Sequence, residues 1–216
     1  MPERDLRDGR DGQSELRERN LRHLKSQGLI ERVALDGQDR AVVLTDRGRE
    51  LLEHHQRSRD HRQVFHSGAD KPRERSHDAQ VYRAYLHAAE RLRERDARIV
   101  RVELDRELKR DYQRFLQERN RDRSDSDGRP DRDAHEIEEW AREHDLPFFA
   151  DSVHFPDLRI EYEVASRLEH EDIEVVTANY RGAHAASRGR SGFTCYGGRS
   201  GRSGGSRGGG LADEFV

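Results

Sequence analysis

Cysteine is nearly absent from this sequence, which holds a single one, Cys195. One thiol excludes an intrachain disulfide and any zinc site built on paired cysteines. Long apolar runs are missing as well, and no stretch approaches the roughly 18 apolar residues that a membrane span needs. The first residues, Met1 to Asp5, lack the apolar core of a secretory signal. We therefore expect a cytoplasmic protein that has no membrane partner.

Hydrophobic residues are also scarce, at 31% of the chain, whereas 39% of the residues are charged. A chain of 216 residues with this composition can bury modest cores but must also carry long solvated stretches. The net charge is only −3, because an acidic middle outweighs a slight excess of base at the two ends. This balance excludes a uniformly basic nucleic-acid-binding protein, so any contact with nucleic acid must come from local patches.

The first 57 residues have the pattern of a helix, a β-hairpin and a second helix. Leu16, Leu21 and Leu24 give the first helix a partial apolar stripe. Turn residues at 36–39 separate two short apolar runs. The expected elements are a helix over 14–27, strands over 29–33 and 41–44, and a helix that Thr45-Asp46 caps.

The run from Leu21 to Gly48, with its segments Leu-Arg-His-Leu-Lys and Leu-Thr-Asp-Arg-Gly, resembles winged-helix DNA-binding domains. In such domains the helix before the hairpin enters the major groove and the hairpin lies beside it. One or two further helices usually come first, so the resemblance implies a partial winged-helix module over residues 1–57. The implied DNA contacts are Arg17, Arg19, Arg22 and Arg40. Acidic residues lie between these arginines, and an ordinary solvated surface is an equally good interpretation of each one.

Three segments follow this module. Residues 58–76 are polar and contain Pro72, which is typical of a linker. Residues 77–196 alternate between helical and strand patterns and predict an α/β domain in the order α-β-(helical insert)-β-β-α-β. Residues 197–216 are dominated by Gly, Ser and Arg, so no core can form there and we expect a disordered tail.

The strongest strand signal of the second domain is the alternation of Leu158, Ile160 and Tyr162 with charged residues. The other elements follow from apolar spacing, turn residues and caps. We expect helices over 77–95, 105–116, 134–144 and around 182–190, strands over 99–104, 158–164, 173–177 and 193–196, a charged loop over 119–133, and a turn over 165–171.

Two carboxylates stand on neighbouring strands of this expected domain: Asp157 opens one strand after Pro156, and Glu174 lies in the next. Nucleases of the PD-(D/E)xK group have this layout, in which the carboxylates hold a divalent ion and a lysine orients the attacking water. Here Val176 occupies the lysine position, and Arg188 in the following helix is the matching residue. Arginine can clamp phosphate but cannot give up its proton. The predicted catalytic set is therefore Asp157, Glu174 and Arg188, with Asp157 and Glu174 as ligands of Mg²⁺ if DNA is cut.

Several segments of the second domain resemble the replication-relaxation family. They are His77-Asp78-Ala79, Arg101 to Lys109, Pro156 to Glu163, and Tyr180-Arg181-Gly182. This family is linked to plasmids and integrative elements, and it joins a winged helix to a nuclease-like domain. The resemblance implies an α/β protein in which a partial winged-helix module precedes a restriction-endonuclease-like domain. Arg181, just past Glu174, is a further candidate for holding DNA phosphate.

Three functions stay open on the sequence alone, and DNA is the partner in each. The first is a DNA-binding accessory protein of plasmid or mobile-element replication or mobilisation, with a degenerate nuclease-like domain and with a relaxase or another mobile-element protein as a further partner. The second is a Mg²⁺-dependent DNA nuclease or nickase. The third is a transcriptional regulator that uses the winged helix.

Overall fold

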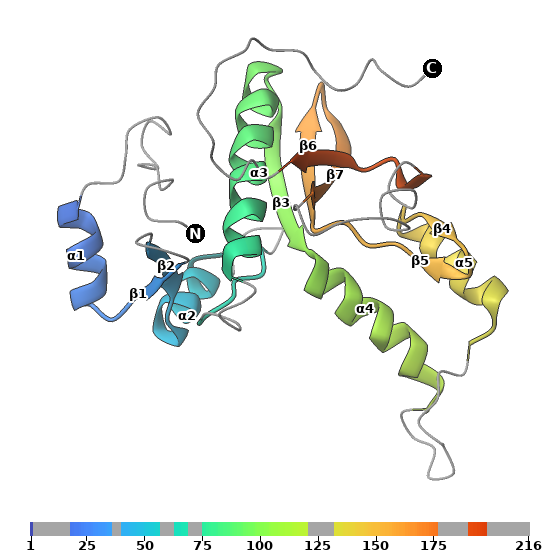
Figure 1. Cartoon of the computed structure of the whole chain (residues 1–216), viewed down its shortest axis with the longest axis horizontal. Coiled ribbons are helices and arrows are strands. Elements are labelled where there is room, and N and C mark those ends of the chain that lie inside the picture. The colour runs from blue at the N-terminus through green and yellow to red at the C-terminus, as the bar shows by residue number, and fades with distance from the viewer. Residues whose placement is uncertain are drawn as a thin grey trace.

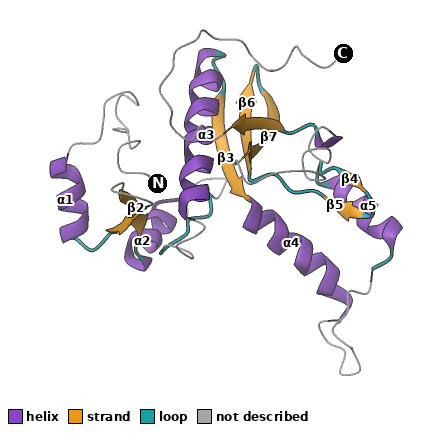
Figure 2. Ribbon diagram, viewed as in Figure 1, coloured by secondary structure: helices purple, strands orange, loops and turns teal. Residues whose placement is uncertain are grey.

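A computed structural model describes residues 1, 18–35, 40–56, 63–68, 75–120, 132–176 and 190–197. Within these ranges the chain forms a mixed α/β structure of five α-helices and three small sheets (Figures 1 and 2). None of the described helices combines the length and the apolar composition that a membrane crossing requires.

The N-terminal module consists of α1 (Glu18–Ser26), β1 (Ile30–Ala34), β2 (Arg40–Leu44) and α2 (Asp46–Gln56). The two strands pair antiparallel, and Leu21 of α1 packs with Ile30 and Val42 in a small core. Thr45 accepts the backbone N–H of Gly48 on its Oγ1 at 3.1 Å, which makes Thr45 the N-cap of α2. The predicted order of helix, hairpin and capped helix is therefore present in the described residues.

A four-stranded sheet forms the centre of the second part of the chain. Its strands are β3 (Arg98–Leu104), β6 (Leu158–Val164), β7 (Arg167–Val176) and β8 (Thr194–Gly197), in the order β3-β6-β7-β8. The pairs β3–β6 and β6–β7 are antiparallel, whereas β8 runs parallel to β7. Helix α3 (Arg75–Glu94) lies along one face, as Figure 2 shows, and its buried Ala88 and Leu92 pack with Leu158, Ile160 and Ile173.

The alternation along β6 sorts its side chains between two faces. Leu158, Ile160 and Tyr162 belong to the core beneath α3. Arg159 and Glu161 therefore lie on the opposite face, because successive strand residues point to opposite sides. We call this second side the polar face of the sheet.

An insert separates β3 from β6 and covers part of the polar face. It comprises α4 (Asp105–Gln117), the 3₁₀ turn Glu118–Asn120, α5 (Ala134–Glu143) and a hairpin of β4 (Phe148–Phe149) and β5 (Ser152–Val153). Leu108, Trp140, Ala141 and Leu146 form its own small core. In Figure 1, α4 leaves the end of β3 and projects away from α3.

The predicted turn over 165–171 is wrong in its extent. Only Ala165 and Ser166 form the turn, both with left-handed φ angles of 49° and 60°, and β7 begins at Arg167. The run from Arg167 to Asp172 is almost entirely charged, so its sequence shows no apolar alternation. Pairing with β6 makes it a strand, because the ladder places Glu169 opposite Tyr162. The β4–β5 hairpin was also not predicted.

Part of the predicted linker makes specific contacts. In residues 63–68, which we call the strap, the Gln63 side chain accepts the Val102 N–H at 2.8 Å and donates to the Val102 carbonyl at 2.6 Å. His66 Nε2 lies 3.1 Å from Glu107 Oε1, and Ser67 forms a β-bridge with Leu44. The strap thus covers the outer edge of β3 and joins the N-terminal module to the sheet. Most of the predicted loop over 119–133, of the predicted helix around 182–190 and of the predicted tail over 197–216 lies outside the described residues. Gly197, the first residue of the predicted tail, is instead the last residue of β8.

Candidate functional site

Asp157 stands where β6 begins, and its carboxylate holds three elements together. Its Oδ2 accepts the Val175 N–H of β7 at 2.7 Å, and its Oδ1 lies 3.1 Å from His77 Nε2 of α3. Its backbone carbonyl accepts the N–H of Asp105, at the start of α4, at 3.1 Å. With 15% of its side chain exposed, Asp157 is largely enclosed by these contacts.

Glu174 lies on β7, the neighbour of β6. The last pair of the β6–β7 ladder at this end is Leu158 with Ile173, so one further step sets Asp157 across from Glu174. Glu174 is half-buried, and it is paired with Cys195 in the ladder of β8. The two predicted carboxylates thus come from adjacent strands, but Asp157 turns its oxygens to His77 and to the backbone of β7.

The fit of a Mg²⁺ ion depends on Asp157. Proteins hold Mg²⁺ through one or two carboxylates that leave room for bound water. Each Asp157 oxygen already accepts one hydrogen bond, from His77 or from the Val175 amide, so a metal could use only the lone pairs that these bonds leave. Among the described residues no three His, Cys, Asp or Glu side chains converge as a metal group. These contacts give the Asp157 carboxylate a structural role, and Arg188, the third predicted catalytic residue, lies outside the described residues.

His77 also belongs to this site, although the sequence assigned it no function. Its hydrogen bond to Asp157 raises the pKa of His77 above 6.5, although burial acts in the opposite direction. An ionised carboxylate only accepts hydrogen bonds, so Nε2 of His77 carries the proton that it shares with Asp157. The pair lies 80 positions apart in the chain, and nothing in the local sequence indicates it.

The polar face carries a buried row of charge across three strands. Arg159 of β6 stands opposite Glu103 of β3 on one side and Asp172 of β7 on the other. Burial raises the pKa of Glu103, although Arg101 lowers it. Burial, the largest single effect, lowers the pKa of Arg159, but the hydrogen bond to Asp172 together with the negative charges of Asp172 and Glu103 raises it overall.

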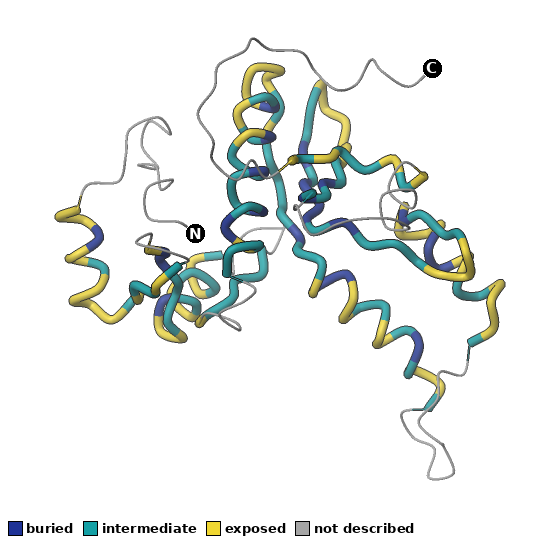
Figure 3. The backbone as a smooth tube through the Cα atoms, viewed as in Figure 1, coloured by how far each residue is buried: buried dark blue, intermediate teal, exposed yellow. Residues whose placement is uncertain are grey.

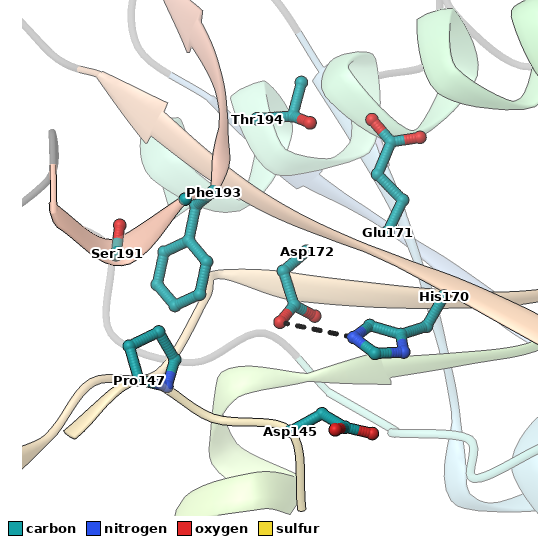
Figure 4. Close-up of a pocket in the computed structure, with 9 residues that line it drawn as sticks. Asp145, Pro147, His170, Glu171, Asp172, Ser191, Phe193 and Thr194 are labelled. Atoms are coloured by element: carbon teal, nitrogen blue, oxygen red, sulfur yellow. Dashed lines mark ion pairs between the residues drawn. The ribbon is translucent and has the colours of Figure 1, made fainter. Parts of the chain in front are cut away.

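A pocket of about 290 Å³ opens beside this row (Figure 4). Asp172, one of its residues, is hydrogen-bonded to Arg159 and lies 4.0 Å from His170 Nε2. Neither Asp157 nor Glu174 lines the pocket, so it is separate from the predicted carboxylate pair. Its lining consists of Asp145, Pro147, His170, Glu171, Asp172, Ser191, Gly192, Phe193 and Thr194.

The arginines predicted to contact DNA divide into two groups. Arg19, Arg22 and Arg40 are exposed, whereas Arg17 and Arg181 lie outside the described residues. Arg19 and Arg22 share the side of α1 that faces away from buried Leu21.

One acidic residue, Glu18, stands next to this side of α1. Arg22 lies 3.5 Å from it, and Arg32 of β1 makes a closer ion pair with it. The hydrogen bond from Arg32 lowers the pKa of Glu18, so Glu18 stays ionised and paired. Arg32 thus balances the acidic charge nearest to the basic side of α1.

No protein-family model, no curated protein and no solved structure matches this chain. The replication-relaxation assignment is therefore a proposal that rests on the residues quoted for it, and so are the nuclease-like and winged-helix assignments.

Proposed function

We propose that the protein binds duplex DNA through the outer side of α1 and does not cut it. The observation that carries this proposal is the composition of that side: Arg19, Arg22, His23 and Ser26 lie opposite the buried stripe, and all four are exposed. A helix backed by a hairpin suits the major groove, which is about 12 Å wide and admits one α-helix. The arrangement of α1, β1, β2 and α2 supports reading this module as a partial winged helix.

The setting of this activity is proposed from resemblance. Members of the replication-relaxation family belong to plasmids and integrative elements, so we propose an accessory role in replication or mobilisation, in the cytoplasm, with a relaxase or a related protein as partner. The order α3-β3-β6-β7-β8, with an insert after β3, supports a restriction-endonuclease-like second domain. The engagement of Asp157 with His77 and Val175 favours binding over cleavage in that domain.

Binding is tested by fluorescence anisotropy of a labelled duplex titrated with the full chain at several salt concentrations. Each phosphate contact contributes about 0.9 to the slope of log affinity against log salt. The double variant Arg19→Ala/Arg22→Ala is expected to reduce that slope by about 1.8. The matched control is Arg98→Ala/Arg142→Ala, which removes two exposed arginines that also form ion pairs. Equal slopes for the double variant and its control would refute the role of α1.

A Mg²⁺-dependent nickase is the second candidate, and the position of Asp157 across from Glu174 on adjacent strands favours it. The test is relaxation of supercoiled plasmid with and without Mg²⁺. Asp157→Asn is the informative variant, because its amide oxygen can still accept the Val175 N–H while the negative charge is lost. Nicking by the native chain that Asp157→Asn abolishes would establish the nickase and overturn the cleavage-free proposal.

A further inference from the structure

The outer side of α4 is a continuous basic surface that the DNA-binding proposal does not use. Arg106, Lys109, Arg110 and Arg114 follow the spacing of one helix side, and all four are exposed. Gln113 completes this side, which we call the α4 basic face. Leu108 and Leu116 of α4 are buried and lie outside this face.

The acidic residues of α4 lie at the margins of the basic face. Asp105 lies 2.7 Å from Lys109, and Asp111 lies 3.1 Å from Arg114, in pairs whose side chains are all 39% exposed or more. Exposed pairs of this kind contribute only about 0–1 kcal/mol, so a phosphate can compete for the cation. Glu107, the remaining carboxylate, is buried and turned toward His66 and the Leu104 amide.

The side chains of the α4 basic face indicate which kind of partner it can bind. It has no apolar side chain to insert into a bilayer, because the apolar side of α4 is already packed in the core of the insert. It has no aromatic side chain on which unpaired bases could stack, because Tyr112 and Phe115 are turned toward Trp140. What it offers is a row of cations, which complements a phosphate backbone.

The geometry of α4 matches a duplex. With a rise of about 1.5 Å per residue, Arg106 and Arg114 stand about 12 Å apart along the helix axis, similar to the width of the major groove. The helix is held at both ends of this row, by the hydrogen bond from the Leu104 N–H to the Glu107 carboxylate at its start and by the stacking of Phe115 on Trp140. Figure 3 shows exposed stretches of the tube along α4, which projects from the sheet.

The neighbouring helix α5 sets the direction of approach. Its exposed positions include Glu138, Glu139 and Glu143, which repel phosphate. The insert is thus basic on α4 and acidic on α5, and a duplex meets it from the α4 side.

We infer that the α4 basic face is a second DNA-binding surface, which takes the phosphate backbone of a duplex independently of α1. This inference takes from the proposed function only that the partner is DNA. Contacts to phosphate carry no sequence information, so this surface adds affinity and salt dependence rather than sequence recognition.

The test uses the full chain and the same labelled duplex. The variant Lys109→Gln/Arg110→Gln/Arg114→Gln removes three charges of the face and is expected to reduce the salt slope by about 2.7. The control Arg98→Gln/Arg142→Gln/Arg167→Gln removes the same charge from exposed positions outside α4. Thermal melting of both variants confirms that they fold.

The outcomes separate this inference from the proposed function. A slope reduced by the α4 variant but not by its control supports the inference, whatever the α1 variant does. A slope that responds to α1 and is the same for the α4 variant and its control overturns the inference and leaves the proposed function intact. A chain that does not bind duplex overturns both. A labelled single strand is titrated in parallel. If the α4 variant weakens binding of the single strand and leaves binding of the duplex unchanged, the assignment of a duplex is overturned.

Discussion

Removal of the Arg159 side chain should strongly destabilise the second domain. Its Nε and Nη2 donate to the two Asp172 oxygens at 2.6 Å and 2.8 Å, and its Nη1 donates to the His144 carbonyl at 2.7 Å. A further bond of 3.0 Å from Nη2 reaches the Asp145 carbonyl. The side chains of Arg159 and Asp172 are only 8% and 10% exposed. Arg159 therefore fastens the end of α5 to the sheet and balances a buried carboxylate.

Arg159→Met keeps much of the volume and removes the charge, which leaves the largely buried Asp172 with only the distant His170, 4.0 Å away, as an ionic partner among the described residues. Breaking a buried ion pair in this way costs about 3–5 kcal/mol. Since the stability of a whole domain is only about 5–15 kcal/mol, the variant should unfold at a clearly lower urea concentration. Replacing both partners, as Arg159→Met/Asp172→Leu, should recover most of the loss, because an apolar pair does not leave a charge unbalanced.

The assay is urea unfolding followed by circular dichroism, with Arg98→Met as the control. Arg98 forms an ion pair with Glu163 on the same sheet, but its side chain is 70% exposed, so its loss should cost at most about 1 kcal/mol. The reasoning fails if Arg159→Met costs no more than Arg98→Met, or if the double variant is no more stable than the single one.

Three further variants test other parts of the structure. Gly48→Ala should destabilise the N-terminal module, because a Cβ there would lie 2.0 Å from the Leu29 carbonyl oxygen. Alanine favours a helix over glycine by about 1 kcal/mol, so thermal melting shows which effect is larger. Thr45→Ala should cost about 1 kcal/mol through loss of the α2 cap, measured by urea unfolding. His77→Asn should lower the melting temperature most below pH 6.5. The raised pKa of His77 stabilises the fold in that range, and this stabilisation is lost as pH rises through that pKa. A difference in melting temperature that does not depend on pH would contradict the pairing with Asp157.

Local pattern was enough to predict the elements that bury one side against the core. The alternation from Leu158 to Val164 gave the extent of β6 and separated its apolar side from its charged side, because a strand has a fixed period of two. Thr45 likewise marked the start of α2, because an N-cap needs only a hydroxyl and the next turn of backbone. The beginning of β7 was missed, since its charged residues become a strand only through pairing with β6.

The candidate site was harder to predict because its contacts join distant parts of the chain. The sequence placed Asp157 and Glu174 on neighbouring strands but could not reveal that His77, 80 positions earlier, meets Asp157. The alternation that indicated β6 puts Arg159 on the side away from the apolar core, a side that an antiparallel strand commonly turns to solvent. The end of α5 covers that position instead, through the carbonyls that Arg159 binds. A period identifies which face a residue lies on, and only the packing of other elements decides whether that face is buried.

The distribution of charge is compatible with the proposed binding of DNA by a chain whose net charge is −3. Much of the acidic charge of the sheet is balanced within the protein, as in the pair of Asp172 with Arg159. The exposed excess of base lies on α1 and α4, in different parts of the molecule. The strap connects these two parts, because Ser67 bridges to β2 while His66 contacts α4 through Glu107. A connection of fixed length raises the effective concentration of one basic helix near a duplex once the other has bound, provided that both can reach it. If both surfaces bind one duplex as proposed, a Gln63→Ala variant, which loosens the strap at the edge of β3, should weaken DNA binding as well as stability.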